Sequence, residues 1–269
     1  MGSAYRDRLD AYVAGSRVPM IVGGRAKFVA DDDRLMNSAF LIEPGADSYP
    51  RYSKQQLVPF GEYIPGPGWI KSYFIEHLSP YGPGVDYTLR PGERATVFEV
   101  EVDRGDVSDL ASLPESFRAA APICFEDVVG HLCREMVYGN TGEKRVDVLV
   151  NVTNDGWFAG THQGWQHMQI ASLRCIENRV PMVRSVNTGV SGFIDSSGRV
   201  TQVVGSDGKS QEVAGHATAV VTLDQRTTLY GRIGEAGPVG VGLTAVLLLL
   251  LTRVPPRSAR VASAKKEAA

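Results

Sequence analysis

The sequence is poor in cysteine and has no excess of charge of either sign. Three Cys in 269 residues are too few for a disulfide scaffold, and none lies in a CxxC pair of the kind that binds zinc. The 28 Lys and Arg residues nearly balance the 30 Asp and Glu. This balance argues against nucleic acid as a partner, because proteins that bind phosphate backbones usually carry a basic excess. With 43% hydrophobic residues, the chain is expected to fold around a sizeable core and to keep its thiols free.

The two ends of the chain differ in character. The first residues lack a basic stretch followed by an apolar run, so no signal peptide is expected. Residues 236–252 are uncharged and mostly apolar, at the lower limit of the roughly 17–25 residues with which a helix crosses a bilayer. The basic residues that follow this run are Arg253, Arg257, Arg260, Lys265 and Lys266.

From this apolar run we predict a transmembrane helix over residues 230–254. Because loops rich in Lys and Arg stay in the cytoplasm, we predict that residues 255–269 form a basic cytoplasmic tail. The remaining domain, residues 1–229, would then lie outside. The alternative is that the apolar run is a buried core helix. An external domain also needs a means of export that this sequence does not show, which would be resolved if the chain is the later part of a longer membrane protein.

Hydrophobic patterning along the middle of the chain is typical of an α/β protein. Residues 96–102 alternate between apolar and polar, as a half-exposed strand does, whereas 146–152 are β-branched and nearly continuous, as a buried central strand is. Helical spacing of apolar residues occurs in 6–14 and 167–179. Further strands are expected over 18–22, 37–42, 119–124, 180–183 and 192–195. A mixed sheet covered by helices is the natural architecture for this order.

The first segment that suggests chemistry runs from Tyr52 to Pro65. Lys54 precedes Glu62 across a Pro-Phe-Gly turn that could direct both side chains into one cavity. Such a lysine could stabilise a developing oxyanion, and the glutamate could orient it. The alternative is an ordinary pair of surface charges on a loop, which this segment taken alone favours.

The second segment is Ala121 to Glu126. Cys124 ends an apolar strand where the chain turns, which is how nucleophiles are often presented. Its thiolate would need a base or a nearby cation to form at neutral pH. Cys133 and Cys175 lie on helical stretches, and we expect both to be small buried hydrophobic residues.

The third segment runs from Asn151 to Phe158 and continues through 184–189. Polar residues such as Asn154 and Asn187 follow predicted strands, as residues at the rim of an α/β site do, although Asn154 could also form a turn before Gly156. His167 is a weak candidate for a catalytic base, since the sequence places no acidic partner beside it. A Cys-His protease is therefore not favoured.

Taken together, these motifs resemble the apolipoprotein N-acyltransferase family of the nitrilase superfamily. The motifs are YSKQQLVPFGEYIP, PICFE, NVTNDGWF, ASLRCIENR and RSVNTGVSGFIDSSG, and the resemblance runs from about Arg17 to Arg253. It implies a nitrilase-like αββα sandwich, truncated at its N-terminus and followed by the terminal membrane helix. It implies neither a metal ion nor a cofactor. It also implies a bacterial inner-membrane protein whose catalytic domain lies on the periplasmic side.

The resemblance assigns roles to four residues. Cys124 would take an acyl chain from a phospholipid as a thioester, and Lys54 would stabilise the oxyanion. Glu62 and Glu126 match acidic positions that the family needs near the site, and Phe125 stands where the family commonly has Tyr. The acyl group would pass to the amine of an S-diacylglyceryl-cysteine at the start of an apolipoprotein.

One departure from the family pattern concerns the general base. The family uses a Glu in a Trp-Pro-Glu segment before the lysine, and this sequence has no such segment. The chain is therefore expected to be catalytically incomplete unless another chain supplies the missing part. Two alternatives are a soluble nitrilase-type amidase, in which water resolves the thioester, and a decayed chain that merely keeps the fold.

Residues 65–90 are predicted to form a loop that is bounded by Gly and Pro and contains bulky apolar side chains. Trp69 and Phe74 are candidates for a lid that contacts substrate and dips into lipid, because amphipathic aromatics favour the membrane interface. The alternative is that they pack on the core.

Overall fold

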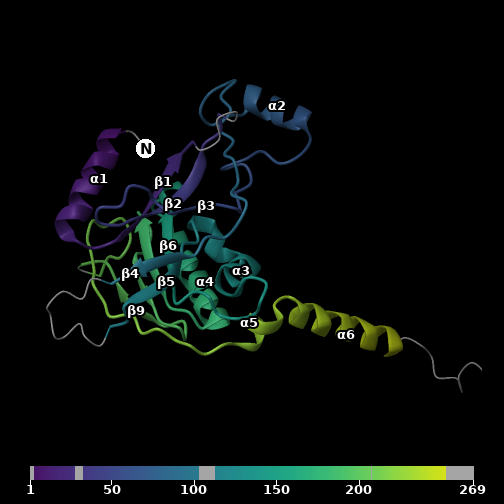
Figure 1. Cartoon of the computed structure of the whole chain (residues 1–269). Coiled ribbons are helices and arrows are strands. Elements are labelled where there is room, and N and C mark those ends of the chain that lie inside the picture. The colour runs from purple at the N-terminus through teal and green to yellow at the C-terminus, as the bar shows by residue number, and fades with distance from the viewer. Residues whose placement is uncertain (1–2, 28–32, 103–112, 207, 253–269) are drawn as a thin grey trace, which may run out of the picture.

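A computed structural model describes residues 3–27, 33–102, 113–206 and 208–252, which form two β-sheets with helices outside them (Figure 1). The smaller sheet is antiparallel and has the order β1-β2-β3. Its strands are β1 (Met20–Ala26), β2 (Met36–Ile42) and β3 (Arg51–Ser53). The strands predicted over 18–22 and 37–42 are therefore confirmed, with shifted ends.

The larger sheet has six strands in the order of the chain, β4 to β9. They are β4 (Phe98–Glu101), β5 (Ser116–Ala120), β6 (Val148–Asn154), β7 (Met182–Asn187), β8 (Gly192–Ile194) and β9 (Val200–Val203). The central strands β5, β6 and β7 are parallel, and the outer pairings are antiparallel. Parallel strands are buried on both faces, which explains the nearly continuous apolar run of β6.

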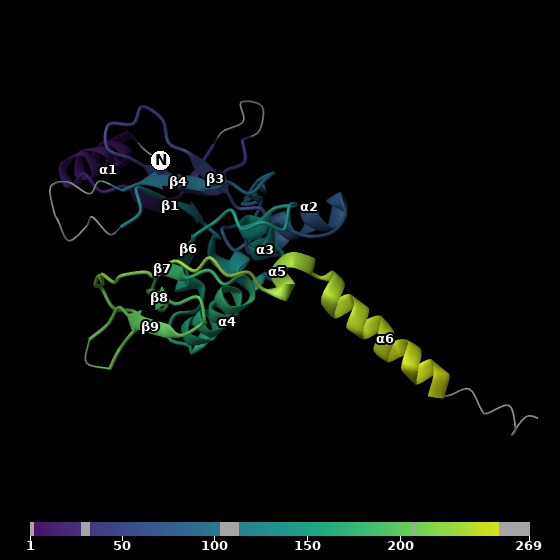
Figure 2. The same ribbon diagram turned by 60° about the horizontal axis from the view of Figure 1, so that its bottom comes forward.

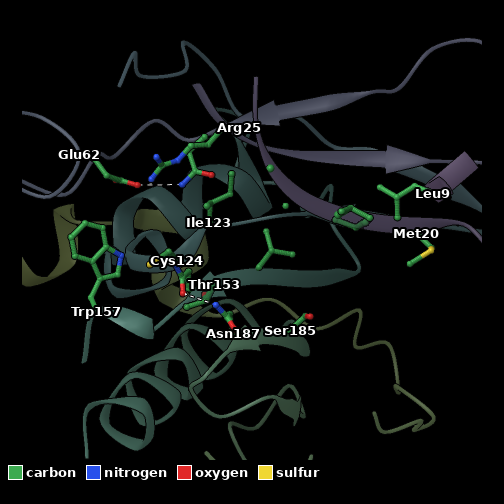
Figure 3. A pocket seen from close by; sticks show the side chains of 17 residues that line it. Leu9, Met20, Arg25, Glu62, Ile123, Cys124, Thr153, Trp157, Ser185 and Asn187 are labelled. Carbon is green, nitrogen blue, oxygen red and sulfur yellow. Dashed lines mark hydrogen bonds between the residues drawn. The ribbon is translucent and has the colours of Figure 1, made fainter. Parts of the chain in front are cut away.

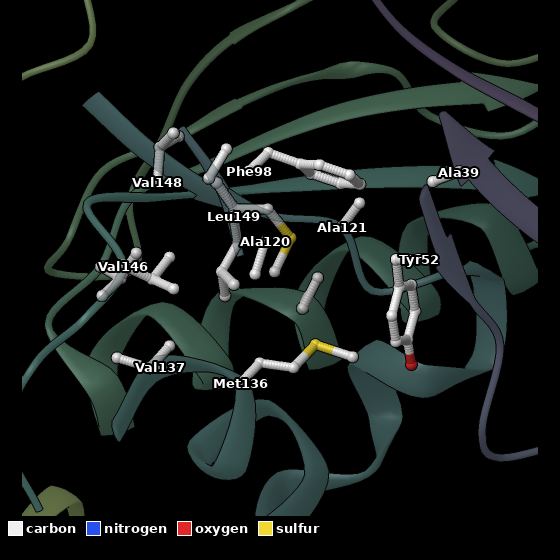
Figure 4. Close-up of a cluster of buried hydrophobic side chains, with 14 of the residues drawn as sticks. Ala39, Tyr52, Phe98, Ala120, Ala121, Met136, Val137, Val146, Val148 and Leu149 are labelled. Carbon is white, nitrogen blue, oxygen red and sulfur yellow. The ribbon is translucent and has the colours of Figure 1, made fainter. Parts of the chain in front are cut away.

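Strand β2 packs on both faces, because residues 39–42 are all apolar and successive side chains of a strand point to opposite sides. Ala39 and Leu41 point into the main core between the sheets, whereas Phe40 and Ile42 point outward to α1 (Ser3–Ser16). Figure 4 shows Ala39 and Tyr52 of the smaller sheet near Phe98 and Ala121. On the far face of the larger sheet, α3 (Gly130–Tyr138) and α4 (Gln163–Asn178) bury one side each. The expected αββα arrangement is thus present.

Two segments differ from their predictions. The segment 65–90 is not a loop throughout, since it contains α2 (Gly68–His77), which has no buried residue. Strand β5 ends at Ala120, so Cys124 lies beyond the strand rather than at its last position. Pro122, which has no N–H to donate to a ladder, lies in the stretch between them.

The predicted membrane span, 230–254, is divided in the structure. A short helix α5 (Leu229–Ile233) ends at Gly234, whose φ of 56° breaks the helix, and α6 (Ala236–Thr252) follows. Helix α6 projects away from the sandwich (Figure 2). With 17 residues it stays below the roughly 20 that a span needs, and no helix in the described ranges is long and apolar enough to cross a membrane. The predicted tail, 255–269, lies outside the described residues.

Candidate active site

Cys124 begins a short 3₁₀ turn, η2 (Cys124–Val128), which follows strand β5 after residues 121–123. Ile123 still pairs with Val152 of β6, so the chain leaves the sheet at Cys124 itself. The φ of Cys124 is 51°, in the left-handed region that a non-glycine residue adopts only when its surroundings impose it. A strained, half-buried thiol on a sharp turn has the geometry that can present a side chain to a substrate.

Cys124 lies between two cavities, of about 450 and 480 Å³. The residues common to both are Glu62, Cys124, Asn154 and Trp157. The first cavity runs between β1 and the ends of β6 and β7, with Leu9 and Met20 at the end opposite Glu62 and Trp157 (Figure 3). The second is lined mainly by apolar groups, including Phe60, Phe125 and Phe158. One thiol is therefore reachable from two differently lined spaces.

Lys54 and Glu62 form a buried ion pair, as the Pro-Phe-Gly turn suggested. Lys54 is 1% exposed and Glu62 is 7% exposed, and Lys54 Nζ lies 2.6 Å from Glu62 Oε2. The Val58 N–H donates to the same oxygen at 2.9 Å, and Asn37 Nδ2 donates to Oε1 at 3.2 Å. The alternative of two independent surface charges is thus wrong. Because its carboxylate is held from three sides, Glu62 fixes the position of the ammonium.

The acidity of the Cys124 thiol reflects opposing effects. Burial raises its pKa above the ordinary value of a thiol and outweighs the positive charge of Lys54 and the backbone N–H groups of Phe125 and Asn154, which lower it. The negative charge of Asp155 also raises it. The lysine therefore acts on the thiol, and the same charge and N–H groups would act on an oxyanion formed there.

Glu126 is a clamp between two segments rather than a wall of either cavity. It is fully buried, and its Oε1 accepts hydrogen bonds from the Tyr52 hydroxyl at 2.7 Å and from the Gln55 and Gln56 N–H groups at 2.7 and 3.0 Å. Its Oε2 accepts from the Ile123 N–H at 2.8 Å. Glu126 thus ties the backbone beside Lys54 to the residue before Cys124.

Asn154 and Asn187 lie at the carboxyl ends of the neighbouring parallel strands β6 and β7. Both line the first cavity, and Asn187 Nδ2 donates to Asn154 Oδ1 at 3.0 Å. The Gly156 N–H also donates to Asn154 Oδ1, so the side chain forms the expected turn as well. Both predicted substrate-binding asparagines are therefore placed beside Cys124.

Trp69 and Phe74 lie on α2 and outside both cavities beside Cys124. Trp69 is 73% exposed, so it does not pack on the core. Phe74 packs against Phe60, with ring centroids 5.7 Å apart, and Phe60 lines the second cavity. Phe74 therefore reaches the site only through Phe60, and Trp69 does not reach it.

His167 is the residue that the sequence analysis undervalued. It is 4% exposed, and it lies between two carboxylates: Nε2 is 2.7 Å from Asp127 Oδ1, and Nδ1 is 2.9 Å from Asp155 Oδ1. Arg184 pairs with the other oxygen of Asp127. These residues come from η2, the end of β6, α4 and β7, so their chain separations gave no signal of contact. Within the described ranges, no three His, Cys, Asp or Glu side chains are arranged to hold a metal ion.

The charge of His167 predicts a pH dependence of stability. Burial opposes the imidazolium, but the hydrogen bonds to Asp127 and Asp155 outweigh it and raise the pKa to about 9, from an ordinary 6.5. A pKa raised in the folded state stabilises it fully below the unfolded pKa, and this contribution is lost as the pH rises through 9. We expect the free energy of unfolding to fall by roughly 3 kcal/mol between pH 6.5 and 9.5 from this group. Urea titrations across this range measure it, and a His167→Gln variant should lose most of the slope.

The sequences of several curated proteins match this chain over most of its length. The relative named apolipoprotein N-acyltransferase from Geobacter metallireducens is 30% identical over 235 residues, which is 86% of this chain and 39% of that protein. The relative of the same name from Chlorobaculum tepidum is 30% identical, with 92% of this chain and 42% of that protein covered. The resemblance found in the motifs is confirmed, and the chain spans about two fifths of the length of these relatives.

Solved structures share the fold at low sequence identity. Saccharomyces cerevisiae Nit3, a member of the nitrilase superfamily, superposes with a TM-score of 0.50 at 14% identity, over 78% of this chain and 63% of that one. The C. elegans NitFhit protein gives a TM-score of 0.51 at 15% identity, over 76% of this chain and 43% of that one. The family described as carbon-nitrogen hydrolase matches residues 11–230. This chain belongs to the carbon-nitrogen hydrolase family.

Proposed function

We propose that the chain carries the catalytic site of an apolipoprotein N-acyltransferase. Cys124 accepts an acyl chain from a phospholipid as a thioester, and the chain then passes to the N-terminal amine of S-diacylglyceryl-cysteine on an apolipoprotein. The observation that carries this proposal is the buried Lys54–Glu62 pair. The positive charge of Lys54 acts on the strained thiol of Cys124, which lines two cavities. The name shared by the relatives supports the same reaction.

In the first step the Cys124 thiolate attacks the ester carbonyl of the phospholipid. The carbonyl oxygen becomes an oxyanion, which the Lys54 ammonium and the Phe125 N–H stabilise. The oxyanion collapses, the ester C–O bond breaks, and the lysophospholipid oxygen leaves with the proton that the Cys124 thiol gave up when the thiolate formed. The products are a thioester at Cys124 and a lysophospholipid.

In the second step the neutral α-amine of the acceptor attacks the thioester. The same donors stabilise the second oxyanion, the amine nitrogen gives up one proton to water, the C–S bond breaks, and the thiolate is restored. An α-amine with a pKa near 8 is partly neutral at physiological pH. Because both substrates react with one sulfur in turn, ping-pong kinetics are expected.

The two cavities suit different parts of the substrates. The second, whose lining includes Phe60, Phe125 and Phe158, offers an apolar surface for the acyl chain. The first contains the amides of Asn154 and Asn187, which can donate to and accept from peptide groups of the acceptor.

Association with a membrane is supported by two helices with exposed apolar side chains, α6 and α2. Val241 and Leu249 of α6 are 73% and 64% exposed, and its apolar side chains lie on all sides, so water is an unfavourable surrounding for it. Seventeen residues of helix are about 25 Å long, close to the roughly 30 Å of the hydrocarbon core. In this proposal α6 enters the bacterial inner membrane, the sandwich lies on the periplasmic side, and the basic residues 255–269 lie in the cytoplasm.

The position of α2 predicts a second contact with lipid. Replacing Trp69 and Phe74 together with Ser should weaken association with phospholipid vesicles about 10-fold, because two aromatic side chains would no longer enter the interface. Cosedimentation with vesicles measures this effect. A Tyr12→Ser variant, at an aromatic residue of α1 that is 64% exposed, is the control, and equal binding of the double variant and the wild type would contradict the role of α2.

The general base implied by the resemblance has no assigned residue. Glu62 and Asp155 are the acidic side chains that line the two cavities, and both already accept hydrogen bonds. We expect full turnover to require the segment of the family that carries the Trp-Pro-Glu motif. Adding that segment in trans should raise the rate of acyl transfer, whereas full activity of the present chain alone would refute this requirement.

The decisive experiment is to incubate the protein with phospholipid vesicles, with the upstream segment in trans, and to weigh the protein by mass spectrometry. One acyl chain should appear on the peptide that contains Cys124, and Cys124→Ala should remain unmodified. A lipopeptide with a free amine should then remove the acyl group. Release to water at an equal rate without the lipopeptide would favour the amidase, and the absence of any thioester would contradict the proposal.

A further inference from the structure

His167 connects two segments that are distant in the chain. Asp127, on η2, is bonded to Nε2, and Asp155, just after β6, is bonded to Nδ1. Both ring nitrogens are therefore occupied by carboxylates. A histidine in this position has no free lone pair with which to take a proton from a substrate, so general-base catalysis is not its role.

The same two segments supply residues beside the thiol, since Phe125 follows Cys124 on η2 and Asn154 lines both cavities with Cys124. The Phe125 N–H belongs to η2, and the Asn154 N–H belongs to the end of β6, one residue before Asp155. The separation of these two N–H donors is set by the separation of the segments that carry them. His167 is the side chain that spans this separation through two hydrogen bonds.

The ends of this bridge are fixed by further contacts. Arg184 of β7 pairs with the second oxygen of Asp127, so that carboxylate cannot turn away. Asp155 packs closely against Gly189, where an added Cβ would lie 2.2 Å from Asp155 Oδ2. Asp127 is fully buried, and Asp155 is 5% exposed. Because both carboxylates are buried and held in place, a change at His167 is expected to shift both η2 and the end of β6.

We propose that His167 is a positioning residue, which holds the two N–H donors at the separation that stabilises the Cys124 thiolate. The inference rests on the proposed function, since it takes Cys124 as the nucleophile. The charged groups that act on His167 are Asp127, Asp155 and Arg184, and the charge of Lys54 acts on the thiol. Cutting the bridge at either end is expected to make the thiol less reactive.

Alkylation of Cys124 by iodoacetamide tests this inference without phospholipid or acceptor. The other thiols, Cys133 and Cys175, are 0% exposed, so Cys124 should react first, which peptide mass analysis verifies. At pH 8 we expect His167→Gln to slow alkylation about 10-fold, equivalent to a rise of about one unit in the thiol pKa. His131→Gln, at an exposed histidine of α3, is the matched control and should react at the wild-type rate.

A second pair of variants separates position from charge and does not depend on the folding of His167→Gln. Asp155→Ala removes a negative charge that raises the thiol pKa, so charge alone predicts faster alkylation. The bridge predicts slower alkylation, because the Nδ1 contact is lost. Asp155→Asn keeps an acceptor and should restore at least the wild-type rate.

The outcomes test the positioning role of His167 and the proposed acyl transfer separately. Faster alkylation of Asp155→Ala, or a folded His167→Gln protein that reacts within two-fold of wild type, would overturn the positioning role. A normal alkylation series together with no thioester from phospholipid would instead contradict the proposed acyl transfer and leave the positioning role supported.

Discussion

Replacing Lys54 with Met is expected to slow acyl-enzyme formation at Cys124 about 10²–10³-fold, the size of effect seen when one oxyanion donor is removed. Lys54 is the cation whose charge acts on the thiol, and it is buried where solvent does not screen it. The rate at which the thioester appears, followed by mass spectrometry, measures the effect. A rate within a few-fold of wild type would show that the lysine takes no part in the step.

The same variant should also destabilise the fold, because the Glu62 carboxylate would remain buried without its cation. Breaking a buried pair typically costs about 3–5 kcal/mol. The double variant Lys54→Met with Glu62→Gln removes both charges, so it should recover much of the stability without recovering the rate. Lys71→Met, which breaks an exposed pair with Asp86, is the control and should change stability by less than about 1 kcal/mol.

The second large effect is expected at Glu126. All four of its partners are donors, so the site is built for an ionised carboxylate. In Glu126→Gln an amide NH₂ would face the N–H of Ile123 or the donors from Tyr52, Gln55 and Gln56. We expect a loss of roughly 3 kcal/mol in the free energy of unfolding, since at least one buried donor is left without an acceptor.

The structure also predicts a consequence of Glu126→Gln for reactivity. Loosening the clamp should allow the backbone beside Lys54 to move away from the turn that begins at Cys124, so thioester formation should slow as well. Chemical denaturation measures the stability, and Glu135→Gln, at an exposed position of α3, is the control for the change of residue type. If both variants unfold at the same denaturant concentration, the clamp does not hold the two segments together.

Local sequence signals predicted the parts of the site that lie close together in the chain. The apolar run before Cys124 and the turn between Lys54 and Glu62 are encoded within a few residues, and both are present in the structure. Cys133 and Cys175 are buried, as their helical spacing suggested. Pattern alone left Lys54 and Glu62 as a surface pair, because burial of a loop depends on what packs over it.

The contacts that join distant segments could not be predicted in this way. His167 lies 40 residues from Asp127 and 12 from Asp155, and helical periodicity says only which face of α4 it occupies. Trp69 and Phe74 were given one role, yet the fold exposes the first and packs the second against Phe60. In each case the partner is chosen by the packing of other elements.

The sequence by itself determined the apolar run that lets β2 pack on both faces, the run that buries β6 and the order of motifs that marks the family. These are local or one-dimensional properties, since periodicity and composition act along the chain. Only the tertiary structure decided that the carboxyl ends of β6 and β7, the turn at Cys124 and the Lys54 loop meet at one thiol. That meeting depends on strand order and helix packing, which no single segment contains.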